Sequence, residues 1–185
     1  MDDIVHQAMV KWPNVPDCYG WLGLDGRGQW CLRDDAAQAA GSFASGQPGA
    51  KGSVLLHEKL LGFIARNYAA DASGRWYFQN GPQRVYLELQ HTPWIWRVDA
   101  SGAVTSHTGV PAAVYASYLD EAGLLYLHAA LGFGLVHTAD MERAATQVEQ
   151  GLWMPEEVQA STLPARFGYA ISPQQGARGD GIAIK

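Results

Sequence analysis

The sequence predicts an α+β fold: a predominantly antiparallel, meandering β-sheet built from Asp-x-x-Gly hairpins, with two main helices packed on it. Three observations favour this class. Residues 75–89 alternate between side chains for two faces, which is the period of a strand. Asp-x-x-Gly occurs four times before apolar strand formers, and this pattern suits a tight turn. Residues 54–68 and 140–150 carry apolar side chains at helical spacing.

The N-terminal part predicts a short helix followed by a hairpin. Residues 2–11 place apolar side chains on one stripe, and Trp12-Pro13 ends the helix because a residue before proline favours extended backbone. Residues 18–24 form the first predicted strand, which two glycines weaken. After a turn at Asp25–Gly28, residues 29–33 return antiparallel to it.

Residues 34–52 are rich in Gly, Ser, Ala and Pro, and we expect a mobile loop there. Either Asp34 or Asp35 could cap a short helical turn that stops at Gly41. Ser53 then resembles an N-cap, and residues 54–68 form the best predicted helix in the chain.

The central hairpin spans residues 75–89 and has two candidate registers. A two-residue loop at Asn80-Gly81 would place Trp76 opposite Val85. Pro82 lacks the N–H that closes such a turn, so a four-residue loop would instead place Phe78 opposite Val85. Both registers keep the same side chains on the same face.

The rest of the chain predicts further strands, one helix and a tail. The strands are expected near 94–98, 103–106, 110–119, 124–128 and 131–137, and 110–119 could also begin with one helical turn. The helix spans residues 140–150 and stops at Gly151.

We therefore expect one domain over residues 1–152. An irregular tail, 153–185, packs on it or trails from it. We interpret Arg178-Gly-Asp180 in the tail as a chance match to an integrin-type tripeptide.

Composition excludes several classes of protein. The 185 residues are 48% hydrophobic, enough for a core, and carry a net charge of −5 with scattered basic residues. We therefore expect no nucleic-acid partner and, without a long apolar run, no membrane partner. The start of the chain is acidic rather than basic and then apolar, so we expect a soluble cytoplasmic protein.

No motif predicts a catalytic, metal or cofactor site. Six histidines form no HxxxH, HxH or HExxH pair, and Gly-x-Ser-x-Gly and Ser-x-x-Lys are absent. Cys18 and Cys31 are too few for a zinc site. We interpret them as free thiols rather than a disulfide, because a cytoplasmic compartment is reducing.

The candidate ligand site is a set of aromatic and arginine side chains on the open face of the sheet. Arginine can hold a carboxylate or phosphate, while Tyr and Trp offer stacking area. The alternative is that this face packs against a second helix or another subunit. The candidates are Trp12, Tyr19, Trp21, Arg66, Tyr77, Arg84 and Tyr86.

Four strings together resemble a known family. They are KWPNVPDCYGWLGLD (11–25), FIARNYAAD (63–71), GRWYFQNGPQRVYLEL (74–89) and LGFGLVH (131–137). They are similar to an uncharacterised family of small proteobacterial proteins known only as a domain of unknown function. The resemblance implies a bacterial, cytoplasmic single-domain protein and implies no activity, cofactor or partner.

Three functional hypotheses follow. The first is a cytoplasmic, non-enzymatic binding or regulatory module that accepts a small anionic or aromatic ligand on the sheet. The second is an enzyme whose acid–base groups, Glu88, His91 or His137, meet only in three dimensions. The third is a homo-oligomeric interaction domain that uses exposed aromatic residues as its interface.

Overall fold

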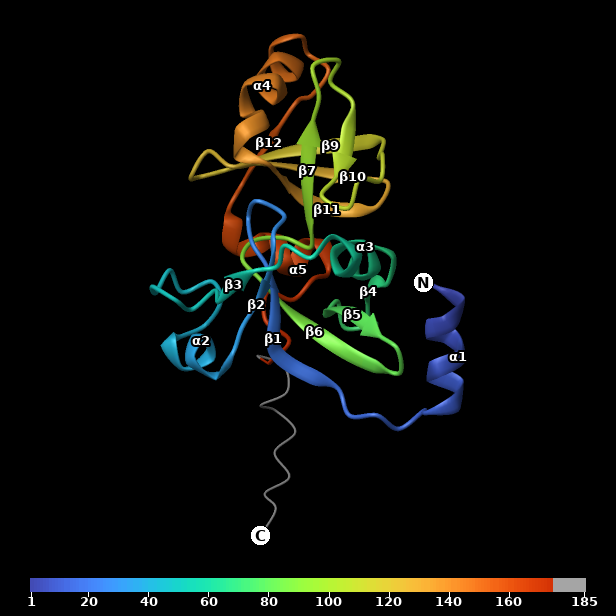
Figure 1. The fold of residues 1–185 in the computed structure, drawn as a ribbon. Coiled ribbons are helices and arrows are strands. Elements are labelled where there is room, and N and C mark those ends of the chain that lie inside the picture. Colours follow the sequence, from blue (N-terminus) through green and yellow to red (C-terminus); the bar gives the residue numbers. More distant parts are fainter. Residues whose placement is uncertain (175–185) are drawn as a thin grey trace. The chain divides into compact units, whose positions relative to one another are not determined.

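The computed structural model describes residues 1–174, and the chain divides into two compact units (Figure 1). Residues 175–185, including Arg178-Gly-Asp180, lie outside the described part. Unit 1 comprises Met1–Leu24, Trp30–Gln90 and the segment from Tyr169, and unit 2 comprises Asp25–Gln29 and His91–Gly168.

The α+β class is as predicted, and seven of the ten strand pairings are antiparallel, but the strands form two mixed six-stranded sheets instead of one sheet. Three strand pairings are parallel: β1 with β6, β7 with β11 and β9 with β12. Parallel strands are joined by long connections, so no short turn motif in the sequence predicts which strands pair.

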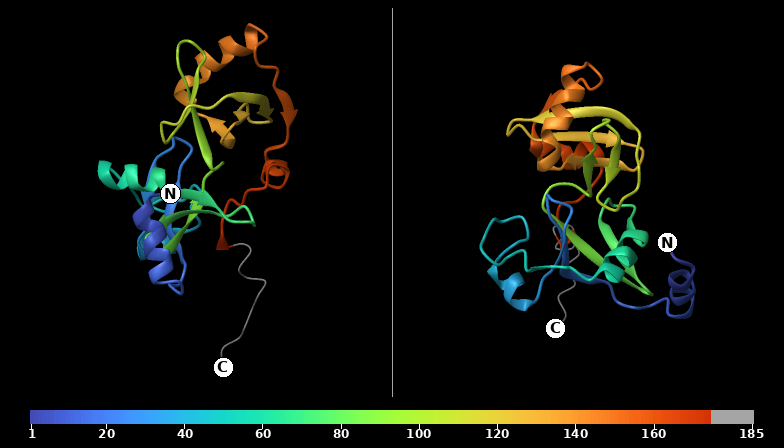
Figure 2. Two further views of the ribbon diagram at one scale, coloured as in Figure 1. Left: turned by 90° about the vertical axis from the view of Figure 1, so that its right-hand side faces the viewer. Right: turned by 45° about the horizontal axis from the view of Figure 1, so that its top comes forward.

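The sheet of unit 1 has the strand order β3-β2-β1-β6-β5-β4, with β1 and β6 parallel at its centre. Figure 2 shows the same strands from two further sides. The strands are β1 (Cys18–Leu24), β2 (Trp30–Leu32), β3 (Ser53–Val54), β4 (Tyr68–Ala70), β5 (Trp76–Asn80) and β6 (Gln83–Leu89).

Unit 1 contains the α-helices α1 (Asp3–Lys11), α2 (Asp35–Ala40) and α3 (Glu58–Arg66). The first two agree with the sequence, and the Oδ1 of Asp34 caps α2 by accepting the Ala37 N–H at 2.8 Å. Helix α3 is shorter than the predicted 54–68. Ser53 and Val54 instead pair with β2, and the Nδ1 of His57 caps the helix by accepting the Leu60 N–H.

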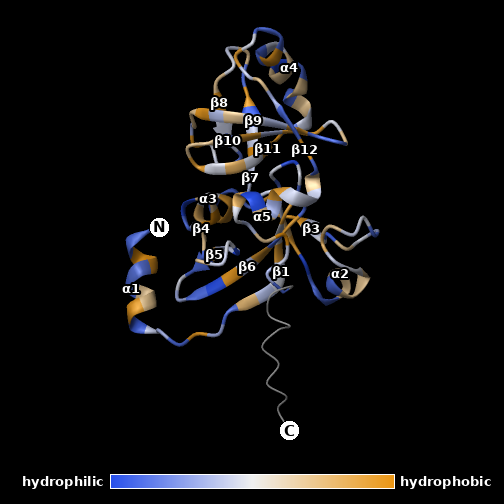
Figure 3. Cartoon of the chain, turned by 180° about the vertical axis from the view of Figure 1, so that it is seen from behind, coloured by the Kyte–Doolittle hydropathy of each residue, from blue (hydrophilic) through white to orange (hydrophobic). Residues whose placement is uncertain are grey.

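The central hairpin pairs Asn80 with Gln83 and Phe78 with Val85, so Gly81 and Pro82 form the loop. This pairing of Phe78 is the one expected for the longer loop, although the loop itself has only two residues. Strand β6 runs from hydrophilic residues at the hairpin to hydrophobic ones at its other end (Figure 3). That change places its second half in the core, where Leu87 and Leu89 are buried.

The sheet of unit 2 has the order β12-β9-β10-β11-β7-β8. Its strands are β7 (Trp94–Val98), β8 (Val104–Ser106), β9 (Val114–Asp120), β10 (Leu125–Ala129), β11 (Gly132–Val136) and β12 (Glu156–Val158). Helix α4 (Met141–Glu149) lies where a helix was predicted, after the 3-10 turn Thr138–Asp140. The core of unit 2 includes Trp96, Leu127 and Leu135, all fully buried.

The described part of the C-terminal tail is more regular than the sequence suggested. It contains β12, the 3-10 turn Ala160–Thr162 and α5 (Leu163–Phe167). The ring of Phe167 stacks on Phe133 with centroids 3.7 Å apart. Pairing with β9 and this aromatic contact order a segment that has little periodicity of its own.

The four Asp-x-x-Gly segments share one set of hydrogen bonds. In each, the Gly N–H donates to the Asp backbone oxygen, and the Asp carboxylate accepts the N–H groups two and four residues on. Each segment connects two strands that pair antiparallel.

No helix within residues 1–174 is long and apolar enough to span a bilayer. The cytoplasmic location stays a prediction.

Candidate ligand pocket

Four of the seven candidate residues, all seven of which belong to unit 1, form one cluster. The rings of Tyr19 and Tyr86 stack in parallel with centroids 4.8 Å apart, and those of Tyr77 and Tyr86 lie 5.6 Å apart. The Arg84 guanidinium lies 4.9 Å from the centre of the Tyr77 ring. Four of the side chains named from the sequence therefore contact one another, and their role in binding a ligand stays a prediction.

Two further side chains complete the cluster and help to cover it. The Arg75 guanidinium lies over the Tyr86 ring, and Asp71 accepts hydrogen bonds from Arg75 Nε and the Tyr86 hydroxyl. Burial raises the pKa of the Tyr86 hydroxyl. Tyr77 and Tyr86 are only 7% and 1% exposed, so the chain itself covers these two of the five aromatic candidates, whereas Trp12 and Trp21 are exposed.

The other three candidates have separate surroundings. Arg66, at the end of α3, pairs with Asp2 at 3.2 Å, and Trp12 follows α1 with the Lys11 amine 4.5 Å from its ring centre. Trp21 lies on β1 and is 45% exposed. Of the seven, only Trp21 lines the pocket described next.

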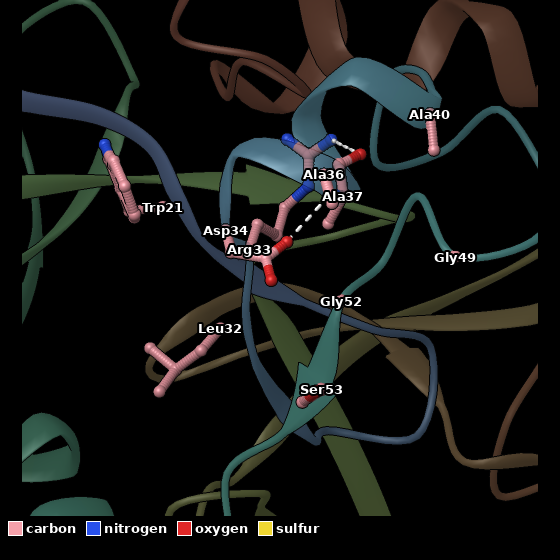
Figure 4. A pocket seen from close by; sticks show the side chains of 10 residues that line it. All are labelled: Trp21, Leu32, Arg33, Asp34, Ala36, Ala37, Ala40, Gly49, Gly52 and Ser53. Carbon is pink, nitrogen blue, oxygen red and sulfur yellow. Dashed lines mark hydrogen bonds between the residues drawn. The ribbon is translucent and has the colours of Figure 1, made fainter.

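Unit 1 contains a pocket of about 610 Å³ beside β1, β2 and α2 (Figure 4). This volume lies within the range of small-molecule sites. It is lined by Trp21, Leu32, Arg33, Asp34, Ala36, Ala37, Ala40, Gly49, Gly52 and Ser53. Most of this lining is apolar side chain or glycine backbone, with few polar groups to orient a ligand.

An irregularity in β1 separates Trp21 from the tyrosine cluster. Cys18 pairs with Val85 and Leu22 with Leu87, so four steps along β1 match two along β6. Residues 19 and 21 of a regular strand would share a face. Here Tyr19 stacks on Tyr86, whereas Trp21 is exposed and lines the pocket. The bulge thus gives Trp21 surroundings of its own.

Glycine is required at the centre of this bulge. Gly20 has φ +83°, a conformation that L side chains rarely adopt. A Cβ there would also lie 2.6 Å from Oε1 of Gln38, the side chain that α2 directs at the bulge.

Arg33 connects the walls of the pocket. Its side chain is buried, with the residue 4% exposed, and it donates only to backbone oxygens. Nε donates to Ala50 at 2.7 Å and Nη2 to Gly41 at 2.6 Å. Longer bonds reach Ala37 on α2 and Gly20 in the bulge. One side chain thereby holds the bulge, the helix and the following loop together.

The segment after α2 is anchored as well. Phe43 is 1% exposed and covers Gly23 so closely that a Cβ on Gly23 would lie 2.4 Å from the phenyl ring. Ala50 is also buried. Two buried residues thus hold the stretch expected to be a mobile loop, and its mobility stays a prediction.

Sequence reasoning missed Arg33 and this loop. Arg33 follows Trp30-Cys31-Leu32 and looks like the polar end of a strand, a position usually exposed. The available signal was Phe43, the one aromatic residue in the Gly-, Ser- and Ala-rich stretch 34–52. An isolated large apolar side chain in such a stretch indicates an anchor rather than a free loop.

Two of the three groups named for an enzyme, Glu88 and His137, have separate local contacts. Glu88 is buried in β6; burial raises its pKa, and a hydrogen bond with Ser172 opposes that rise. The Nδ1 of His137 accepts the Ala139 N–H at 3.0 Å. Neither side chain lines the pocket.

Cys18 and Cys31 do not form a disulfide with each other. Within residues 1–174, no three His, Cys, Asp or Glu side chains are grouped to hold a metal ion.

The comparisons with known proteins gave two similarities. Residues 1–174 match the family model DUF2944, described as "Protein of unknown function (DUF2946)". The crystal structure of a DUF1285 family protein from Silicibacter pomeroyi DSS-3 is similar with a TM-score of 0.46 and 15% identity, over 71% of each chain. The comparison with curated proteins gave no match.

Proposed function

The chain belongs to this family of proteins of unknown function, and we propose that it is a non-enzymatic module that binds a small molecule in the pocket of unit 1. The observation that carries the proposal is the pocket of about 610 Å³ whose walls the buried Arg33 side chain connects. From the predicted aromatic sheet face, the proposed site keeps Trp21 and leaves out Tyr77 and Tyr86, which the chain covers.

The pocket has the features of a preformed ligand site. Arg33 donates to four backbone oxygens around it, so its walls are fixed without a ligand. A site that needs no ordering on binding avoids part of the entropy cost of association. Its lining combines an exposed indole with small side chains, which leaves area and room for an apolar group.

The test is a small-molecule library screened by thermal shift, with hits checked by native mass spectrometry. Compounds that bind should raise the Tm of the wild-type protein and of Tyr115→Ala, an exposed aromatic of unit 2 that does not line the pocket. They should raise the Tm of Trp21→Ala much less, because the indole area is lost. A library without hits, or hits that stabilise Trp21→Ala fully, would overturn the proposed site.

A further inference from the structure

The charge next to the pocket is positive and buried. Arg33 is a basic side chain in the interior of unit 1, and each oxygen that it contacts is a neutral backbone carbonyl. Within residues 1–174, no carboxylate forms an ion pair with it. A buried guanidinium without an anionic partner favours any negative charge that comes near it.

Two carboxyl groups lie near Arg33, and neither neutralises it well. Glu88 lies within the field of Arg33, but burial disfavours its ionised form. Asp34 lines the pocket, yet it is exposed and its Oδ1 already accepts the Ala37 N–H. Water screens an exposed charge far more than a buried one, so the Asp34 carboxylate offsets the buried Arg33 charge only in part.

The shape of the pocket favours a flat group. Ala36, Ala37 and Ala40 present only methyl groups from α2, and Gly49 and Gly52 present bare backbone from the loop. The indole of Trp21 adds an aromatic surface to the same lining (Figure 4). Small walls with one indole suit an aromatic ring better than a branched or strongly hydrated group.

On the basis of the proposed function, we propose that this pocket binds a small aromatic carboxylate. The ring packs against Trp21 and the alanines of α2, and the carboxylate lies on the side of Arg33 and the Ser53 hydroxyl. The carboxylate supplies the negative charge that Arg33 lacks.

The test compares three probes of one shape by isothermal titration calorimetry: 2-naphthoate, the neutral 2-naphthamide and the cationic 2-naphthylmethylammonium. We expect 2-naphthoate to bind at least about tenfold more tightly than the amide, which is about 1.4 kcal/mol. The cation should bind most weakly. Trp21→Ala should weaken the binding of 2-naphthoate and of the amide together, because both share the ring.

One variant isolates the charge. Asp34→Asn keeps a side-chain oxygen that can cap α2 and removes the one carboxylate that lines the pocket. It should tighten 2-naphthoate binding by about threefold, since a nearby like charge is gone, and leave 2-naphthamide unchanged. Asp35→Asn is the matched control, because its exposed side chain follows in the sequence and does not line the pocket.

The outcomes separate this inference from the function on which it rests. Equal binding of the three probes, all lost in Trp21→Ala, would overturn the preference for an anion and leave the binding module in place. No probe bound, while a library compound binds through Trp21, would do the same. If neither probes nor library compounds bind, both the inference and the proposed function fail.

Discussion

At the scale of single residues, Arg33 and His107 show two ways in which a protein accommodates a buried basic side chain. Arg33 remains inside because four backbone oxygens receive its donors. His107 is also buried, but in its uncharged form. Its Nδ1 accepts the Ile95 N–H, and burial lowers its pKa to about 3, so the ring is neutral at physiological pH.

The lowered pKa of His107 predicts a loss of stability in acid. Below pH about 6.5, the ordinary pKa of histidine, His107 binds a proton in the unfolded chain. In the folded chain the ring stays neutral until the pH falls to about 3. Between these values, His107 should lower the free energy of unfolding by about 1.4 kcal/mol per pH unit. In His107→Gln this contribution is absent, so the decline with falling pH should be shallower.

Urea unfolding at pH 7.5, 6, 5 and 4 measures this difference. His6→Gln serves as the control, because His6 is exposed on α1 and its removal should leave the slope of the wild type. Parallel curves for His107→Gln and the wild type would show that His107 is protonated in the folded protein.

At the scale of elements, the bulge in β1 predicts a large effect of a single methyl group. Gly20→Ala meets both an unfavourable φ and the Gln38 side chain, so we expect a loss of about 2 kcal/mol in unfolding free energy. Gly46→Ala is the matched control: its φ is +74°, but nothing lies within 4 Å of the added Cβ. It should lose about 1 kcal/mol from the backbone alone.

The measurement is urea unfolding of both variants, combined with 2-naphthoate titration. Gly20→Ala should also weaken binding, because the bulge carries the oxygen that Arg33 Nη1 contacts and leads directly into Trp21. Equal losses in the two variants, with binding intact, would show that the bulge does not position the pocket.

The elements also show which features local sequence can predict. Helices α1, α2 and α4, the central hairpin and the Asp-x-x-Gly turns depend on neighbouring residues, and their signals are local. Strand β3 was read as helix because its pairing with β2 is a tertiary choice that outweighs propensity. Trp21 was found as an exposed aromatic, but Arg33 was not, since its burial depends on a loop whose course has no periodicity.

At the scale of the whole molecule, the two sheets differ in how far apart along the sequence their paired strands lie. All six strands of unit 2 and its buried Trp96 lie between His91 and Gly168. The central strand of unit 1, β1, instead pairs with β2 on one side and with β6, far along the chain, on the other. The parallel β1–β6 pairing cannot be read from local patterns, which is why one meandering sheet was expected.

This difference predicts which part of the chain folds alone. A fragment of residues 91–168 contains a complete sheet and core, so it should show strand-rich circular dichroism, dispersed amide NMR signals and cooperative unfolding in urea. Its stability should fall short of the same unit in the full chain, because the fragment lacks the turn Asp25–Gln29, whose Gly28 packs against His107. The control fragment, residues 30–90, lacks β1, so its strands separate into β3-β2 and β6-β5-β4. It should not fold, since neither remnant has the partner that closes its core. An unfolded 91–168 fragment would contradict the claim that this stretch contains a self-sufficient sheet. A cooperatively folded 30–90 fragment would contradict the claim that the sheet of unit 1 needs β1.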